Sequence, residues 1–355
     1  MKEMTSWERV LTTISRREPD RVPKTAGFTA TIHERFKKET GSSDPGTYFK
    51  MEPRGVGFKG TKRKVDFARY FEAEPLPPNA SVSEWGTATV PGTFYHFTSK
   101  RYVMARMKSV KELDGYPWPD LKEAYRHEHL EADVKRLHAA GWFVQGGPGH
   151  IFEIAWQLRR MDNLFMDFME NEEMAECILD HICDLQAFVA RRCAQAGVDM
   201  LVTGDDVGMQ DRLMMSPATW RKWFKPRWAR VYAAARAAKP DIHIWYHSDG
   251  KIEEIIPDLI EIGLTVLNPV QPECMDPVAL KKQYGGQLAF WGTIGTQTTM
   301  PFGAPAEVKA TVKRMIETVG KGGGLVLAPT HVLEPDVPWE NIVAFFEGVE
   351  EYGTY

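Results

Sequence analysis

Two histidines and an aspartate are the residues of this chain best suited to bind a metal ion or transfer a proton. The stretch "WYHSDG", residues 245–250, carries His247 and Asp249 two positions apart, and "VLAPTH" carries His331. Two imidazoles and a carboxylate that converge could hold a divalent metal, zinc or another ion, with an open position for substrate. They could equally form a metal-free acid-base group. Taken alone, "HSDG" also matches a polar turn before a helix.

Three further carboxylates follow short apolar stretches and are candidate catalytic groups. Asp205 and Asp206 are adjacent in "TGDDVG". Neighbouring strand residues point to opposite sides, so only one of the two can face a given cavity, while the other could cap the next segment. Glu153 follows "GGPGH" at the start of a predicted helix, where the helix dipole also favours an acid. Asp205, Asp206 and Glu153 therefore join Asp249 as candidate acids or bases.

Neutral and aromatic side chains at similar places are candidates for substrate binding. Asn268 and Gln271 of "NPVQ" offer uncharged hydrogen bonds, or could instead order their own loop. The chain contains 11 Trp and 18 Phe, a supply compatible with a pocket for an aromatic ligand, although large cores use these residues too. We expect Trp245 and Trp291, which lie on predicted strands, to contact such a ligand.

A repeating pattern of strands and helices predicts how these residues are positioned. Six short apolar segments each end in small or polar residues and lead into a helical stretch; they span residues 142–149, 199–206, 242–250, 265–271, 288–295 and 324–331. Alternating strands and helices favour parallel strands with right-handed crossovers. Because polar or small residues close all six, we predict a (β/α)8 TIM barrel rather than a doubly wound sheet, with chemistry at the C-terminal strand ends.

Alternation within residues 242–249 predicts which side chains face the barrel interior. The more apolar set, which includes Ile244 and Tyr246, should pack against helices. The other set should face inward, with its last two members at the open end: His243, Trp245, His247 and Asp249.

The N-terminal part predicts a helix, a strand and an elaboration. Trp7, Val10, Leu11 and Ile14 recur at helical spacing after Thr5 or Ser6, and residues 24–28 form a candidate strand. Residues 41–106 are rich in Gly, Pro and aromatics, and "TATVPGTFYHFTSKRYVM" alternates like a β-hairpin with a Pro-Gly turn. We predict one domain over residues 1–355, in which residues 41–106 form an elaboration near the barrel mouth.

Composition excludes several classes of protein. With 44 basic and 48 acidic residues, the net charge of −4 does not indicate nucleic-acid or membrane-surface binding. The sequence has neither a signal core nor a transmembrane stretch, so we expect a cytoplasmic protein. Four cysteines without paired spacing predict neither disulfides nor a thiolate metal site. None of the six predicted strands is followed by a G-x-G-x-x-G or G-K-[ST] motif, which disfavours nucleotide binding at their ends.

Four separated segments resemble the uroporphyrinogen decarboxylase superfamily. They are "SWERVLTTISRREPDRVP", "HSDGKIEEIIPDLIEIGLTVLNPVQP", "DPVALKKQYGGQLAFWGTIGTQ" and "VLAPTHVLEPDVPWENI". The resemblance extends over nearly the whole chain and implies a (β/α)8 barrel with its cleft at the C-terminal mouth. The superfamily contains decarboxylases and corrinoid-dependent methyltransferases, so membership does not decide the reaction.

Two departures from the family patterns bear on that choice. The decarboxylases carry an arginine motif of the type R-Q-A-G-R-Y for substrate carboxylates, whereas the matching stretch here, "PKTAGFTATIHERF", lacks both arginines. In the methyltransferase branch an H-x-C pair and a later Cys or His hold zinc, and the matching positions are His247, Asp249 and His331. Aspartate at the cysteine position implies a weaker but more Lewis-acidic zinc site.

The resemblance therefore implies a methyltransferase that moves a methyl group from a methoxylated, in our expectation aromatic, small molecule to the cobalt of a separate corrinoid protein. A metal or acid at the mouth would stabilise the departing oxygen. The alternatives are a decarboxylase or lyase acting on a small acid, and a non-catalytic binding barrel. The oligomeric state is not determined by the sequence, and a homodimer is compatible with it.

Overall fold

A curled parallel sheet forms the centre of the protein. The computed structural model describes residues 3–92 and 98–355. Seven strands pair in the order β1-β5-β6-β7-β8-β9-β10, every neighbouring pair parallel. Their bounds are β1 Pro53–Gly55, β5 Phe143–Gly149, β6 Met200–Gly204, β7 His243–His247, β8 Val266–Asn268, β9 Ala289–Ile294 and β10 Leu325–Pro329. All six strands predicted from the repeating pattern are thus confirmed.

The two edges of this sheet approach each other through the segment around Lys24. Lys24 forms a parallel bridge with Leu327 of β10, and the backbone N–H of Glu52, just before β1, donates to the Lys24 carbonyl at 3.2 Å. Phe28 makes a second bridge, with Leu333. The candidate strand at residues 24–28 therefore appears as isolated bridges, and the described chain has a TIM-like sheet of seven named strands.

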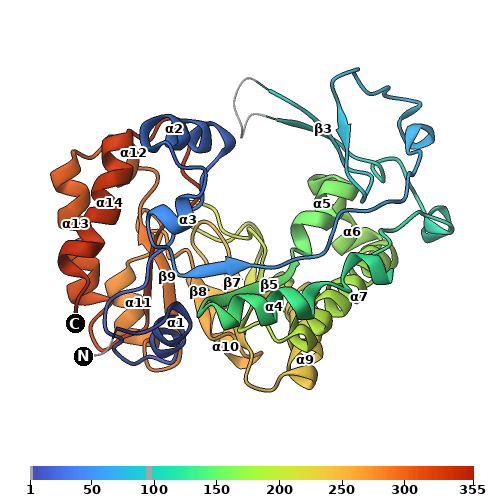
Figure 1. Ribbon diagram of the computed structural model, residues 1–355. Helices are drawn as coiled ribbons and strands as arrows, with labels where there is room; N and C mark the ends of the chain where they lie inside the picture. Colours follow the sequence, from blue (N-terminus) through green and yellow to red (C-terminus); the bar gives the residue numbers. More distant parts are fainter. Residues whose placement is uncertain (1–2, 93–97) are drawn as a thin grey trace.

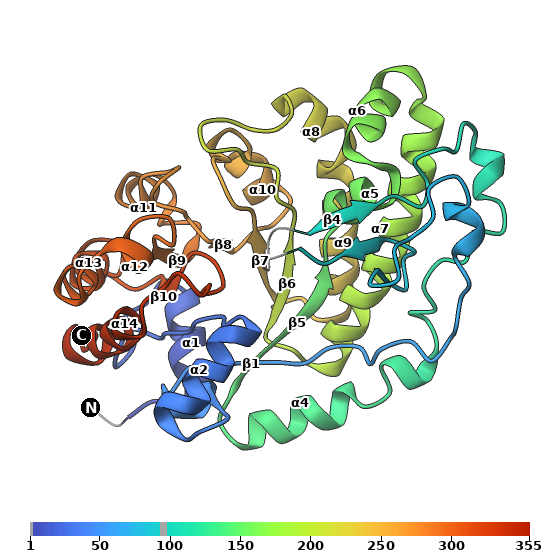
Figure 2. The same cartoon turned by 90° about the horizontal axis from the view of Figure 1, so that it is seen from above.

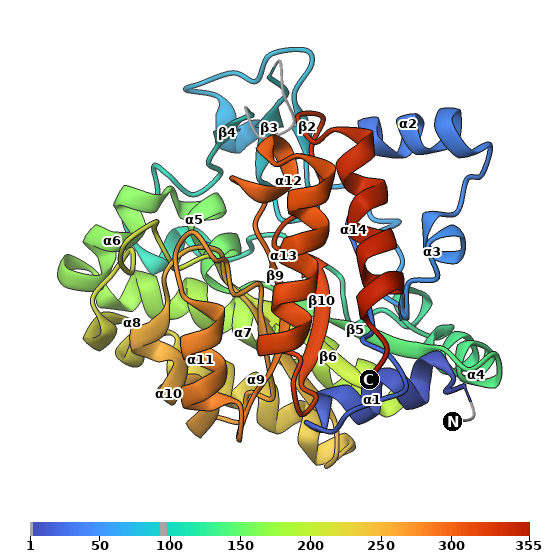
Figure 3. The same ribbon diagram turned by 90° about the vertical axis from the view of Figure 1, so that its left-hand side faces the viewer.

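Helices cover the outside of the curled sheet. Figure 2 shows α7 and α9 along one side of it and α13 and α14 along the other, and Figure 3 shows α13 and α14 side by side. The helix bounds are α1 Ser6–Ile14, α2 Ala30–Thr40, α3 Pro45–Tyr48, α4 Leu130–Ala139, α5 Phe152–Arg159, α6 Met161–Glu170, α7 Glu172–Ala196, α8 Pro217–Trp223, α9 Lys225–Ala238, α10 Ile256–Glu261, α11 Pro277–Tyr284, α12 Thr299–Phe302, α13 Pro305–Thr318 and α14 Trp339–Tyr352. Helix α1 begins after Thr5, whose side chain accepts from the Glu8 N–H, as the predicted cap requires.

Alternating side chains divide the core into two layers. Ile244 and Tyr246 lie in the layer between sheet and helices, where the Tyr246 ring meets Trp228 of α9 edge-on at 5.7 Å. A smaller cluster fills the interior of the curl and includes Met200 and Trp291, with Trp245 packed against it. The predicted inward and outward faces of residues 242–249 are confirmed by this division.

A small antiparallel sheet lies outside the main sheet, beside α5 at the upper right of Figure 1. It consists of β2 Ser81–Val82, β3 Ala88–Val90 and β4 Ser99–Arg101 in the order β2-β3-β4. The predicted Pro-Gly turn between β3 and β4 leads into residues 93–97, which lie outside the described residues. Whether residues 41–106 cover the mouth stays a prediction.

Two further expectations concern cysteines and membrane helices. All four cysteines are free, three of them in α7 and Cys274 in a loop, as predicted. Among the described helices, none combines the length and the apolar character that crossing a lipid bilayer requires.

Candidate functional site

Three predicted residues meet where β6 and β7 end. His247 Nε2 lies 3.5 Å from Asp206 Oδ1 and 3.7 Å from Asp249 Oδ1, and all three side chains are partly exposed. The Asp249 N–H donates to Asp206 Oδ1 at 2.9 Å, which holds the two loops together. Burial raises the pKa of Asp249; the charge of His247 opposes this rise and that of Asp206 adds to it. We call Asp206, His247 and Asp249 the mouth triad.

Asn268 orients the histidine of the mouth triad. Its side-chain Nδ2 donates to the Trp291 carbonyl at 2.8 Å, so its Oδ1 is the atom that faces His247 Nδ1, at 2.6 Å. An amide oxygen only accepts, and the Nδ1 of His247 must therefore carry the proton. Nε2 is the ring nitrogen that faces the two carboxylates.

The mouth triad fits a divalent metal ion. Ligand atoms about 2.0–2.2 Å from a tetrahedral zinc ion lie roughly 3.3–3.6 Å from one another, and the two distances from His247 Nε2, 3.5 and 3.7 Å, are close to this range. One imidazole and two carboxylates suit zinc and several other divalent ions. The hydrogen bond from His247 to Asn268 is the outer-shell contact by which metal-bound histidines are usually oriented.

His331, the third predicted ligand, lies in the loop after β10. It lines a cavity of about 390 Å³ together with Asp249 and Gln271. The groups of His, Cys, Asp and Glu found close enough to share a metal among the described residues include Asp206 with His247 and Asp249, but not His331. Ligation by His331 therefore remains a prediction, and Asp206 is the third residue whose oxygen lies close enough to share a metal ion with His247 and Asp249.

The two predicted amides are nearly buried. Asn268 is 7% exposed and Gln271 is 5% exposed. Gln271 Oε1 accepts from the Gly250 N–H at 3.1 Å, so this amide orders the loop after β7 while also lining the cavity. Asn268 acts on His247, as described above. Of the two, Gln271 is the one placed to touch a ligand in the cavity.

The two predicted aromatic contacts lie deeper in the curl than the cavity. Trp291 is 4% exposed and belongs to the interior cluster. Trp245 packs against that cluster, and its ring stacks on the His247 imidazole with centroids 5.8 Å apart and planes 12° apart. Neither tryptophan lines the cavity. Trp245 thus packs on the His247 ring, whereas Trp291 is linked to His247 only through Asn268, and the contact of either tryptophan with substrate stays a prediction.

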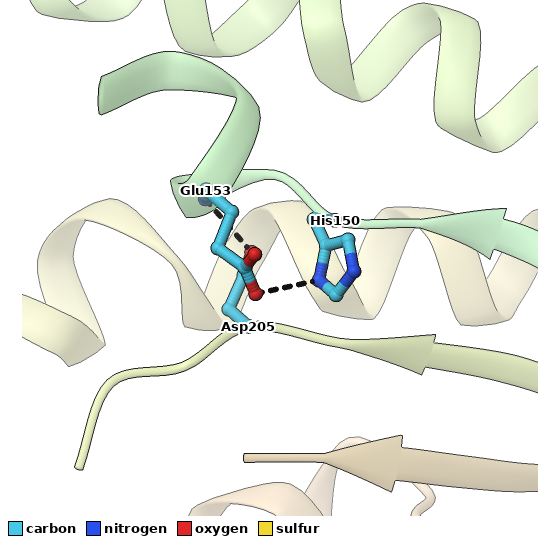
Figure 4. Close-up of side chains that lie close together, drawn as sticks. All are labelled: His150, Glu153 and Asp205. Carbon is cyan, nitrogen blue, oxygen red and sulfur yellow. Dashed lines mark hydrogen bonds and ion pairs between the residues drawn. The ribbon is translucent and has the colours of Figure 1, made fainter. Parts of the chain in front are cut away.

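A second group of three residues lies at the ends of β5 and β6 (Figure 4). His150 Nδ1 lies 2.9 Å from Glu153 Oε1 and 2.8 Å from the Gly204 carbonyl oxygen. Fully buried Asp205 accepts three hydrogen bonds, from the N–H groups of Ile151 and Glu153 and from Trp228 Nε1. Both of its oxygens are thereby occupied. We call His150, Glu153 and Asp205 the anchor triad.

Burial and charge shift the pKa values of the anchor triad. Burial raises the pKa of Asp205 to about 7, although the charge of His150 opposes the shift. Burial lowers the pKa of His150, but the hydrogen bond and charge of Glu153 outweigh it and raise that pKa to about 9. Burial raises and His150 lowers the pKa of Glu153, which ends below its usual value. His150 and Glu153 therefore form an ion pair near neutral pH.

Asp205 and Asp206 lie in different triads, in agreement with the prediction that only one of the two faces a given cavity. Asp206 belongs to the mouth triad, and its N–H donates to Glu153 Oε1 at 3.2 Å, which links the two triads. Asp205 instead holds the start of α5. His150 had no predicted role, although its position in "GGPGH" directly after β5 matches that of the polar residues that close the neighbouring strands.

Two glycines let the loops after β6 and β7 pack closely. A Cβ added to Gly208 would lie 2.5 Å from the Asp249 carbonyl oxygen, and one added to Gly250 would lie 2.6 Å from backbone atoms of Gly208 and Met209. Gly250 also has φ +78°, a left-handed conformation that favours glycine. The loops that carry Asp206 and Asp249 thus touch through their backbones.

Comparison with known proteins identifies the family of this fold and site. A methyltransferase from Methanosarcina mazei has a similar structure, with a TM-score of 0.68, 18% identity and 99% of each chain covered, a likeness that shows a common fold. A psychrophilic glycoside hydrolase family 10 endo-β-1,4-xylanase is more distant, with a TM-score of 0.37, 12% identity and coverage of 61% of this chain and 80% of its own. No curated protein matches the chain. The model of the family described as uroporphyrinogen decarboxylase (URO-D) matches residues 102–352, well over half of the chain. The chain is therefore a member of the uroporphyrinogen decarboxylase family.

Proposed function

We propose that this protein is a methyltransferase that takes a methyl group from a methoxylated small molecule and passes it to the cobalt of a corrinoid carried by a separate protein. The observation that carries the proposal is the mouth triad, with an imidazole nitrogen and two carboxylates spaced as metal ligands are. The common fold with a methyltransferase adds support. The segment "PKTAGFTATIHERF", which lacks the arginines of the decarboxylase motif, weighs against a substrate with many carboxylates.

Cleavage of a methyl ether requires that the departing oxygen be stabilised as it gains negative charge. A divalent ion held by Asp206, His247 and Asp249 would supply a Lewis acid for that oxygen. Asn268 fixes the ring of His247, and the anchor triad fixes the loop that carries Asp206. Asp249 has a raised pKa when no cation neutralises it, so it could instead hold the proton that the oxygen takes.

The corrinoid of the partner protein is the second substrate in this proposal. Its reduced cobalt would provide the electron pair for the new carbon–cobalt bond, while the carbon–oxygen bond breaks and its electron pair stays on the oxygen, which then takes a proton. The partner must reach the donor, so it would dock over the open end where the mouth triad lies. The fold provides orientation and stabilisation of the leaving group, and the corrinoid provides the nucleophile.

Metal content and methyl transfer together test the proposal. The purified protein should contain about one divalent ion per chain, and His247→Ala should lose it. Removal of an outer-shell contact already lowers metal affinity by about 10–100-fold, and removal of a direct ligand should lower it further. With free cob(I)alamin and a methoxylated donor, the native protein should form methylcobalamin, followed by its absorbance, and His247→Ala should not.

His181→Ala is the matched control, because His181 is an exposed histidine of α7 and belongs to neither triad. It should retain both metal and activity. Release of carbon dioxide from a carboxylated substrate without any corrinoid would identify a decarboxylase or lyase instead. Binding of a ligand unaffected by chelators or by His247→Ala, without any turnover, would indicate a non-catalytic barrel.

A further inference from the structure

The cavity beside the mouth triad has a polar lining with a marked bias in charge. Its volume is about 390 Å³, near the lower end of pockets that hold small organic ligands. Among the described residues that line it, three are carboxylates and none is Lys or Arg. The carboxylates are Asp249, Glu334 and Asp336.

Apart from the His331 imidazole, the remaining lining residues have no titratable side chain. Side-chain amides and hydroxyls come from Gln210, Gln271, Gln297, Thr296 and Thr330, and an apolar wall comes from Met209, Val332 and Val337. These groups can hydrogen-bond to hydroxyls, amines or ethers and can pack against a methyl group. None of them provides the fixed positive charge that carboxylate or phosphate ligands usually meet.

Cationic side chains nearby already have acidic partners. Lys251 Nζ lies 3.7 Å from Glu253, and Arg212 pairs with its neighbour Asp211. His150, whose pKa lies above neutrality, pairs with Glu153. An anionic ligand would therefore have to compete with protein carboxylates for each of these cations.

A bound metal ion would not reverse this bias. Two positive charges would balance Asp206 and Asp249, the two acids of the mouth triad, and would not neutralise Asp336, which also lines the cavity. Like charges that meet across an interface disfavour binding, and they reject unsuitable ligands even where other contacts are good.

We infer that the methyl donor of this cavity carries no anionic group and is either neutral or positively charged. The inference rests on the proposed methyl-transfer function and narrows it, because it separates methoxylated alcohols, phenols and amines from methoxylated acids. The observations that carry it are the three carboxylates, the amide and hydroxyl lining, and the pairing of Lys251, Arg212 and His150 with acids.

Three probes that differ in one substituent test the inference: 4-methoxybenzylamine, 4-methoxybenzyl alcohol and 4-methoxybenzoate. Binding to the metal-loaded protein is measured by calorimetry without any corrinoid, at low and at high salt. The acid should bind at least about tenfold more weakly than the alcohol at low salt, because its carboxylate meets the carboxylates of the cavity. Added salt screens these charges and should reduce the difference between the two affinities. The amine should bind at least as well as the alcohol.

A pair of charge-reversal variants provides the control. Asp336 is exposed, so Asp336→Lys should fold. It should raise the affinity for 4-methoxybenzoate relative to that for 4-methoxybenzyl alcohol, and Asp336→Asn should raise it by less. Glu317→Lys makes the same charge change near the end of α13, outside the cavity lining, and should leave all three affinities unchanged.

Equal binding of the acid and the alcohol would overturn the inference, as would a failure of all three probes to bind at millimolar concentration. Methyl transfer is measured separately. If the neutral and cationic probes bind preferentially but no methylcobalamin forms, the result contradicts the proposed function and not this inference. If the acid is turned over at the rate of the alcohol, the result contradicts this inference and not the proposed function.

Discussion

The anchor triad and the mouth triad have nearly the same composition, a histidine and two carboxylates at neighbouring strand ends, but their atoms are used differently. In the anchor triad, backbone N–H groups and Trp228 occupy both oxygens of Asp205, and His150 is paired with Glu153. In the mouth triad, His247 Nε2 faces two carboxylate oxygens at 3.5 and 3.7 Å. Residue types and spacing alone therefore do not decide between the two groups, because both are spaced to share a metal ion; we propose the mouth triad because fewer of its lone pairs are taken by hydrogen bonds.

The largest effect should come from Asp205→Ala, which would remove the acceptor of three hydrogen bonds at a fully buried position. Buried donors left without partners are costly, and we expect a loss of about 3–5 kcal/mol in the free energy of unfolding. Chemical denaturation measures it. Asp206→Ala, one residue further along, should cost less than about 1 kcal/mol, because Asp206 is partly exposed, but should abolish metal binding. Equal destabilisation by the two variants would remove the distinction between the triads.

Asn268→Ala should have an intermediate effect, confined to the mouth triad. Without the Asn268 oxygen, His247 loses the contact that fixes its proton on Nδ1, and metal affinity should fall about 10–100-fold. Competition with a fluorescent chelator measures that affinity. Gln186→Ala is the matched control. The buried Gln186 amide donates to the backbone carbonyl of His150 in the anchor triad, so the metal affinity of this variant should equal that of the native protein. Unaltered metal binding in Asn268→Ala would count against the orientation of His247 described above.

The smallest effect on stability should come from the His150–Glu153 pair, because His150 is partly exposed and solvent screens the pair. The pKa of His150 is raised from 6.5 to about 9, so its contribution to stability is complete below pH 6.5 and is lost as the pH rises through about 9. The difference in Tm between the native protein and His150→Gln should shrink over that window. An NMR titration should give a raised pKa for His150 and a return toward the usual value in Glu153→Gln; an unchanged value in that variant would contradict the ion pair.

Much of the fold could be predicted because strand and helix periodicity is a local property. Six strands, the cap at Thr5 and the inward face of β7 follow from side-chain alternation and capping chemistry. The sequence predicted a strand at residues 24–28, where the structure has only isolated bridges. This difference could not be predicted, because the pairing of Lys24 depends on where β10 and Glu52 lie in space.

The candidate site was predictable in part for the same reason. His247 and Asp249 lie at the mouth because they share a strand face. Whether Asp206 or His331 joins them depends on the course of two loops, which alternation does not describe. The function of Asn268 as the orienting partner of His247 likewise depends on its contact with Trp291, a residue on another strand.

The close contact between Gly208 and Gly250 has a consequence for engineering. Any side chain at either position would meet backbone atoms within 2.6 Å, so a substitution of either glycine would push apart the two loops that carry Asp206 and Asp249. The loops after β9 and β10 supply Gln297, Val332 and Asp336 to the cavity, and none of these three residues is a glycine. Attempts to change which methyl donor is accepted should therefore diversify these two loops and leave the glycine pair unchanged.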